Sequence, residues 1–417
     1  MRRAFLYCLT AVMTLFRPVF PAWNAAYTDL PVTFQVDCVA DVYAPDSQTG
    51  SGVCEYPAIV QLCCQQNAQD NGKLLVTFEK WGDTYPVYES VDDAQSWQYV
   101  GSVSDQLNAG YRNEWMPFLY ELPADIGQFS RGTILLAATS VYGEGVTDST
   151  ITLYESRDSG RTFTAFCNVD KAGGTDWGVW EPYLIYDEQS GRLFCFYSDD
   201  SDPSHSQKLV FRYTTDLVHW SEKTECVACS DPDLRPGMPS VVRMGNGTFF
   251  LVFEMVGIDG NPICCKTSGS LDDWGDAADW GQVVCAAGKT FGSSPCAAWS
   301  PTGGRCGTLI VAGKHPVKGA SKTGCDLFLS FDYGKTFVPV DNPIPYVLDP
   351  TERCGYSPSL LFSHDGETLY YVNNPPVFSS AYKITAAKIT IRERKEASSC
   401  RDLLRSTWKR RTGQTTA

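Results

Sequence analysis

One short pattern recurs along this chain and constrains its fold more than any other feature. The pattern reads Ser/Thr-x-Asp-x-Gly-x-Thr/Ser-Phe/Trp, and two full copies begin at Ser156 and Ser330. Three incomplete copies begin at Ser90, Thr214 and Ser270. The five copies start about 60 residues apart, and a fixed period of this length indicates a repeat architecture.

The residue types in this pattern are those of a tight turn between two antiparallel strands. The Asp side chain accepts hydrogen bonds from turn amides, and the Gly supplies a positive φ. The final aromatic side chain packs beneath the turn. We therefore interpret the copies as structural turns at the outer part of each repeat, and we do not expect them to bind a substrate.

Apolar runs between these turns recur at a similar interval of about 55 to 60 residues. The chain also has 35 Gly, 24 Pro and 13% aromatic residues, which suits many short strands joined by turns. We predict an all-β fold, a six-bladed β-propeller with four antiparallel strands in each blade. An early strand around residues 32–36 would close the last blade and remove its exposed edge. The runs span residues 73–78, 132–138, 192–197, 248–253, 307–312 and 367–372.

Both ends of the chain differ from its body. Arg2 and Arg3 precede an apolar run at residues 4–16, which is too short to span a bilayer and is typical of a signal peptide. A buried N-terminal strand is the alternative. We expect a signal peptide at 1–26, a propeller at 27–390 and a basic, flexible tail at 391–417, in a secreted protein without stable membrane insertion.

Cysteine is abundant, with 17 residues in the chain. Removal of Cys8 with the signal peptide leaves an even number, which in an exported protein predicts several disulfides of unknown connectivity. Close pairs occur at 63–64, 226–229 and 264–265, but none of the four His residues lies near them in a metal-ligand pattern. We therefore expect disulfides or buried thiols and no metal.

The charge of the chain excludes several classes of partner. The net charge of −14 argues against nucleic acid as a partner and against an anionic substrate. The sequence has no Gly-x-Ser-x-Gly motif for a serine hydrolase and no Gly-rich phosphate loop between a strand and a helix. We expect no cofactor, and a neutral ligand.

Two glutamates stand at the ends of apolar segments, beside aromatic residues. Glu181 follows Trp180, and Glu254 follows Phe253. A carboxyl group among aromatic side chains loses solvation, so its pKa rises, as a general acid at neutral pH requires. A second carboxylate that stays ionised can attack the anomeric carbon of a sugar.

Several segments together resemble glycoside hydrolase family 93. They are Trp180-Glu181-Pro182, Arg235-Pro-Gly-Met-Pro239 and Phe253-Glu254-Met255, with further likeness at 114–123, 197–208, 293–295 and 355–360. The resemblance covers roughly residues 45–390. It implies a sialidase-like six-bladed propeller that releases arabinobiose from the non-reducing end of α-1,5-L-arabinan with retention.

The resemblance also implies roles for individual residues. Glu181 is similar to the general acid/base and Glu254 to the nucleophile, although the order of roles within the pair stays open. Arg235 is expected to bind a substrate hydroxyl or hold a carboxylate ionised, with a structural clamp as the alternative. The other substrate-binding candidates, whose aromatic members are core residues in the alternative interpretation, are His205, Gln207, Lys208, Tyr356, Trp115, Trp177, Trp180 and Glu79.

Two other functions are compatible with a propeller. A sialidase would need three arginines and a tyrosine nucleophile, and no Arg-Ile-Pro segment opens the first blade. A non-catalytic carbohydrate-binding propeller would not need both Glu181 and Glu254. The leading interpretation is a monomeric glycoside hydrolase whose partner is an arabinan-like polysaccharide.

Overall fold

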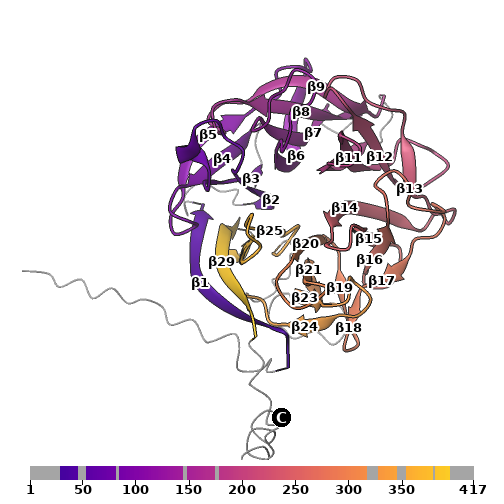
Figure 1. The fold of residues 1–417 in the computed structure, drawn as a ribbon. Coiled ribbons are helices and arrows are strands. Elements are labelled where there is room, and N and C mark those ends of the chain that lie inside the picture. Colours follow the sequence, from indigo (N-terminus) through magenta and orange to yellow (C-terminus); the bar gives the residue numbers. More distant parts are fainter. Residues whose placement is uncertain are drawn as a thin grey trace, which may run out of the picture.

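Six four-stranded antiparallel sheets surround a central axis in the computed structural model (Figure 1). The structure describes residues 29–45, 53–80, 84–143, 148–173, 178–316, 327–344, 354–378 and 381–394. Within these ranges the helical content is a single 3₁₀ turn, η1 (Ala68–Asp70). The predicted six-bladed β-propeller is confirmed.

In the first five blades the strands follow one another outwards from the axis in chain order. From the innermost to the outermost strand, the first blade contains β2 (Cys54–Gln61), β3 (Leu74–Lys80), β4 (Tyr85–Ser90) and β5 (Gln98–Val103). The second contains β6 (Tyr111–Glu121), β7 (Ile134–Tyr142), β8 (Asp148–Ser156) and β9 (Thr164–Lys171). The third contains β10 (Val179–Asp187), β11 (Arg192–Asp199), β12 (Lys208–Thr214) and β13 (Thr224–Val227).

The later blades keep this arrangement, with two small extra sheets. The fourth blade contains β14 (Arg235–Arg243), β15 (Phe249–Val256), β16 (Ile263–Ser268) and β17 (Gln282–Val283). The fifth contains β20 (Cys296–Ser300), β21 (Thr308–Ala312), β23 (Leu327–Ser330) and β24 (Val338–Val340). The extra sheets are formed by β18 (Cys285–Ala286), β19 (Lys289–Gly292) and β22 (His315–Pro316), and by β27 (Pro376–Phe378) and β28 (Ala381–Tyr382).

The sixth blade joins the two ends of the propeller. Its strands, from the axis outwards, are β25 (Ser359–Phe362), β26 (Thr368–Asn373), β29 (Ile384–Glu393) and β1 (Val32–Tyr43). The indigo β1 lies beside the yellow β29 in Figure 1, with Val32 opposite Glu393. The predicted closure is confirmed, and β29 extends three residues past the expected boundary at 390.

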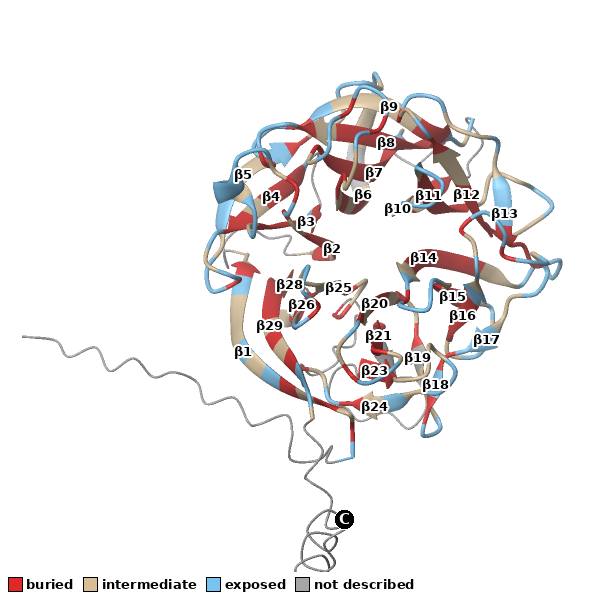
Figure 2. Ribbon diagram, viewed as in Figure 1, coloured by how far each residue is buried: buried red, intermediate tan, exposed pale blue. Residues whose placement is uncertain are grey.

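The second strand of each blade forms the core. Each of the six predicted apolar runs overlaps one of these strands, and β15 is buried along its length except at Val256. Neighbouring blades cover both faces of such a strand, so its sequence is continuously apolar instead of alternating. Figure 2 shows this as red strands inside the ring and paler segments at its rim.

The repeated turns occupy the same place in five blades, between the third and fourth strands. In the copy at Ser156, Asp158 Oδ1 accepts the Thr162 amide at 2.9 Å, and the Gly160 amide donates to Ser156 Oγ at 3.0 Å. Gly160 has a φ of 87°, as expected for this turn. The sixth blade needs no such turn, because its third and fourth strands come from opposite ends of the chain.

The predicted disulfides are not supported by the described part of the chain. Many thiols are separate core side chains; Cys226, for example, donates its S–H to the carbonyl of Leu209 at 3.2 Å. The free thiols include Cys38, Cys63, Cys64, Cys167, Cys195, Cys226, Cys229, Cys264, Cys265, Cys285 and Cys306.

The expected signal peptide and nearly all of the basic tail lie outside the described residues. Among the described residues, no helix is long and apolar enough to cross a membrane.

Candidate active site

A ring of residues with positive φ, each followed by Pro, surrounds one end of the propeller axis. In the first four blades each of these residues lies at a β-bulge of the innermost strand, and in the last two it lies just before that strand. A bulge leaves ladder positions unpaired, so Pro can follow although it has no N–H to donate. The six residues are Tyr56, Met116, Glu181, Met238, Ser294 and Ser357.

These bulges lead into a cavity of about 370 Å³ along the axis. Residues of the six innermost strands and of the segments just before them line the cavity, and Glu181 is its catalytic candidate. The bulge turns the Glu181 side chain out of the ordinary alternation of a strand. Its φ of 62° is uncommon for a non-glycine residue, and such conformations persist where the surrounding structure enforces them.

Two hydrogen bonds fix the Glu181 carboxyl group. Ser198 Oγ donates to Oε2 at 2.5 Å, and the Met238 amide donates to the same oxygen at 2.6 Å. Burial and the negative charge of Glu254 raise the pKa of Glu181 to about 7, against the lowering effect of these donors and of Arg235. The group can therefore hold or release a proton near neutral pH.

Glu254 reaches the same place from the fourth blade. It lies on β15 and is 5% exposed. Ser293 Oγ donates to its Oε2 at 2.5 Å, and the Ser294 amide donates to this oxygen at 3.2 Å. Both hydrogen bonds fall on Oε2, so they orient the carboxyl group while Oε1 faces Gly237.

Gly237 lies beside both carboxyl groups. A Cβ atom built on this residue would lie 3.5 Å from Glu181 Oε2 and 3.3 Å from Glu254 Oε1. These two oxygens therefore lie within about 6.8 Å of each other, the sum of the two distances. Gln207 Nε2 would be 2.8 Å from the same Cβ, and it donates to the Pro236 carbonyl at 2.6 Å.

Arg235 and Trp180 are joined to the site through Asp200. Trp180 Nε1 donates to Asp200 Oδ2 at 2.9 Å, and an Arg235 nitrogen lies 3.9 Å from the same oxygen. Arg235 also lowers the pKa of Glu181 through its charge. The structure therefore places Arg235 close enough to influence the catalytic candidates, as a clamp on Asp200 and as a nearby positive charge.

Two tyrosines form an aromatic wall near the carboxyl groups. The rings of Tyr56 and Tyr356 meet edge to face with centroids 5.2 Å apart, and Lys314 Nζ lies 4.9 Å from the centroid of Tyr356. Burial and the charge of Glu254 raise the pKa of Tyr356 above its usual value. Tyr356 therefore stays neutral, beside Tyr56 and the two carboxyl groups.

The structure distributes the remaining substrate-binding candidates around this centre. Trp115 packs against Trp180 with ring centroids 5.5 Å apart. Glu79 is buried on β3 opposite Glu55. Trp177 lies outside the described residues.

His205 and Lys208 belong to a polar cluster of the third blade. Lys208 Nζ donates to Asp202 at 2.7 Å and to Glu225 at 2.9 Å, and His205 Nδ1 lies 3.6 Å from Asp202. The charge of Lys208 is thus balanced by two carboxylates, so its role in the structure is an ion pair.

Sequence reasoning missed the residues that orient the two glutamates. These are Ser198, Ser293 and Asp200, and they approach from other strands or from the neighbouring blade. One signal was available in the sequence: the six X-Pro pairs at 56, 116, 181, 238, 294 and 357 are a second repeat, about 60 residues in period. That repeat marks Glu181 as the one acidic member of the ring of positive-φ residues.

Comparisons with known proteins agree with this architecture. No family model matches the chain, and no curated protein matches it. Its structure is similar to the Penicillium chrysogenum α-L-arabinanase in complex with arabinobiose, with 28% identity, a TM-score of 0.72, and coverage of 86% of this chain and 98% of that one. It is also similar to the family 93 α-L-arabinofuranosidase of Fusarium graminearum with arabinobiose, with 25% identity, the same TM-score and the same coverage. In its fold the chain is thus similar to glycoside hydrolases that bind arabinobiose, one of them from family 93.

Proposed function

We propose that this protein is an exo-acting, retaining glycoside hydrolase that releases arabinobiose from α-1,5-L-arabinan. The observation that carries the proposal is the pair formed by Glu181 and Glu254 beside Gly237, with the pKa of Glu181 raised to about 7. The similar structures hold arabinobiose, which supports an arabinan-derived substrate. Glu181 Oε2 and Glu254 Oε1 lie at most about 6.8 Å apart. This limit is compatible with the separation of roughly 5–5.5 Å between the two carboxyl groups of retaining enzymes.

The hydrogen bonds favour Glu181 as the proton donor and Glu254 as the nucleophile. Both donors to Glu181 point at Oε2, so the proton of the acid form sits on Oε1. From there it passes to the glycosidic oxygen as the bond to the anomeric carbon breaks. Glu254 Oε1 attacks that carbon and forms a glycosyl-enzyme ester. Glu181, now a carboxylate, then takes a proton from the water that hydrolyses the ester.

The surroundings of the pair fit a neutral sugar. Tyr356 and Trp180 present aromatic surface, which stacks on the apolar faces of sugar rings. Gln207 and Arg235 supply amide and guanidinium groups for hydroxyls. The net charge of −14 does not attract an anionic polysaccharide.

Hydrolysis of linear α-1,5-arabinan tests the proposal. We expect arabinobiose from the wild type and a loss of at least about a thousandfold in rate for Glu181→Gln and for Glu254→Gln. Glu222→Gln, at an exposed position, serves as the matched control and should keep full activity. Proton NMR of the first product should show the α-anomer. A folded wild type that releases nothing from arabinan, or that first releases the β-anomer, contradicts the proposal.

We also propose that the chain is exported after removal of residues 1–26. The proposal rests on Arg2 and Arg3 ahead of the apolar run at residues 4–16. N-terminal sequencing of protein recovered from the medium should begin near residue 27. Recovery only inside cells, with Met1 retained, contradicts export.

A further inference from the structure

Two adjacent cysteines, Cys63 and Cys64, present their thiols to the same side of the chain. Their sulfur atoms lie 3.5 Å apart at a bend that follows β2. Adjacent side chains in a strand point to opposite faces. The second such pair behaves that way: Cys264 and Cys265 of β16 belong to two different core clusters. The geometry at Cys63 is therefore a property of this bend and not of the dipeptide.

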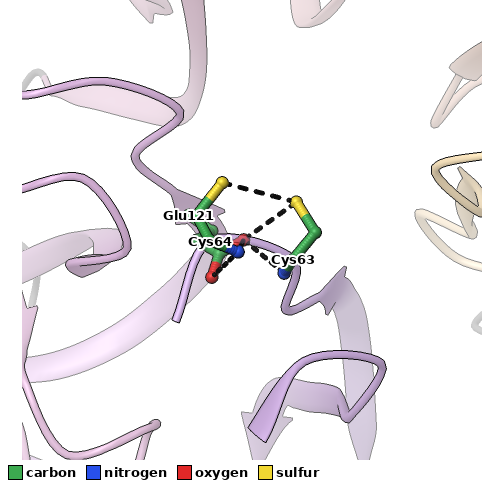
Figure 3. A group of neighbouring side chains, drawn as sticks. All are labelled: Cys63, Cys64 and Glu121. Atoms are coloured by element: carbon green, nitrogen blue, oxygen red, sulfur yellow. Dashed lines mark hydrogen bonds between the residues drawn. The ribbon is translucent and has the colours of Figure 1, made fainter. Parts of the chain in front are cut away.

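Glu121, the last residue of β6, holds the bend in place (Figure 3). Its carboxylate accepts the amides of Cys63 at 2.7 Å and Cys64 at 3.0 Å, and Gln65 Nε2 at 2.6 Å. Gly132 permits the close approach, because a Cβ there would lie 2.3 Å from the Cys64 carbonyl oxygen. The two thiols and the carboxylate are thus positioned before any ligand arrives.

We propose that Cys63, Cys64 and Glu121 bind one thiophilic divalent cation of the Zn²⁺ type. Two thiolates on one tetrahedral zinc lie about 3.8 Å apart, given Zn–S bonds of about 2.3 Å, and the sulfur atoms here are 3.5 Å apart. One donor atom from each of the three residues falls within a mutual distance of 4.8 Å.

The hydrogen-bonding pattern shows where such a cation would sit. Cys63 Sγ donates its proton to Glu121 Oε2 over 3.2 Å, and a cation bridging these atoms replaces that proton. Binding displaces both thiol protons to solvent and leaves two metal–thiolate bonds. Cys63 is exposed, so water can take the fourth position, while Cys64 and Glu121 are buried.

The position of this cluster gives the cation a structural role. Cys63 and Cys64 belong to the first blade and Glu121 to the second, so the cation links two blades. Cys63 and Cys64 follow the innermost strand of the first blade, and Glu121 ends that of the second, so the cluster comes after the bulges at Tyr56 and Met116 along both strands. It therefore lies toward the end of the cavity that is opposite Glu181. We therefore expect the cation to raise the melting temperature without changing hydrolysis.

Cadmium titration of the reduced full-length protein tests this site. Cd²⁺ reports thiolate ligation through a sulfur-to-metal charge-transfer band in the ultraviolet. The wild type should bind one equivalent with this band and melt at a higher temperature, and Zn²⁺ should abolish the band by competition. Cys63→Ser, at an exposed position, should bind at least tenfold more weakly. Cys285→Ser removes an exposed thiol elsewhere and is the matched control.

Two results overturn the proposal. One is a reduced wild type that shows no charge-transfer band with one equivalent of Cd²⁺. The other is a folded Cys63→Ser variant that binds Cd²⁺ as tightly as the wild type, because the cation would then be held by other thiols. Neither result depends on whether the protein hydrolyses arabinan.

Discussion

The carboxyl groups of Glu181, from the third blade, and Glu254, from the fourth, both lie beside Gly237. A methyl group on Gly237 would be 3.5 Å from Oε2 of the first and 3.3 Å from Oε1 of the second. The absence of a side chain on Gly237 thus leaves open a space that touches both carboxyl groups.

Gly237→Ala should therefore impair catalysis more than folding. The added methyl group would lie 2.8 Å from Gln207 Nε2 and would crowd both carboxyl groups. Misplacement of catalytic groups by about 1 Å costs about a hundredfold, so we expect kcat/KM on arabinan to fall by at least that factor. Gly269→Ala, at a glycine with open space around it, is the control and should keep its activity. Full activity in Gly237→Ala would show that the substrate does not pass between the glutamates.

The pH dependence of hydrolysis should follow the protonation of Glu181. Burial and the charge of Glu254 raise its pKa to about 7, and a general acid must carry its proton. We therefore expect kcat/KM to decrease about tenfold per pH unit above about pH 7. A nitrophenyl α-L-arabinobioside, whose leaving group needs little protonation, should show a flatter alkaline limb. Arabinan hydrolysis that stays constant to pH 9 would exclude Glu181 as the acid.

Ser198→Ala should move this alkaline limb. The Ser198 hydroxyl donates to Glu181 Oε2 at 2.5 Å and favours the charged carboxylate, so its loss raises the pKa of Glu181 further. We expect the limb to shift to higher pH, as measured by kcat/KM profiles. Ser190→Ala, on an exposed turn, should leave the profile unchanged. A purely structural role for Ser198 would lower activity equally at every pH.

The periodic part of this fold could be predicted from the sequence, because each blade repeats the same local requirements. The turns at Ser156 and Ser330 need Asp and Gly at fixed offsets, and every second strand needs an apolar run. Both patterns can be recognised in a single sequence, without comparison to related sequences. The turns number five in a six-bladed ring because the pairing of β1 with β29 replaces the sixth.

The partners of the functional groups could not be predicted, since they come from other strands or from a neighbouring blade. Ser198 is 17 residues from Glu181, Ser293 is 39 residues from Glu254, and Glu121 is 57 residues from Cys64. No local sequence pattern indicates that residues so far apart in the chain lie in contact. The same limit applies to the cysteines: their even number after removal of Cys8 predicts disulfides but says nothing about which blade each thiol faces.

Two glycine substitutions separate the effect of packing from that of backbone strain at a repeated turn. Gly160→Ala places a Cβ 2.4 Å from Leu75 Cδ1 at a φ of 87°, whereas Gly72→Ala meets no atom within 4 Å at a φ of 90°. Both variants incur strain of about 1 kcal/mol from the positive φ, and only Gly160→Ala adds overpacking of about 1–3 kcal/mol.

Urea unfolding should therefore show a larger loss of unfolding free energy for Gly160→Ala than for Gly72→Ala. Hydrolysis per folded molecule should stay at the wild-type level in both variants. Gly160 lies between the third and fourth strands of its blade, and Gly72 lies in the connection between β2 and β3, past the opposite end of β2 from Tyr56. Equal destabilisation by the two substitutions would mean that Leu75 moves aside freely and that the turn does not anchor the blade to its neighbour.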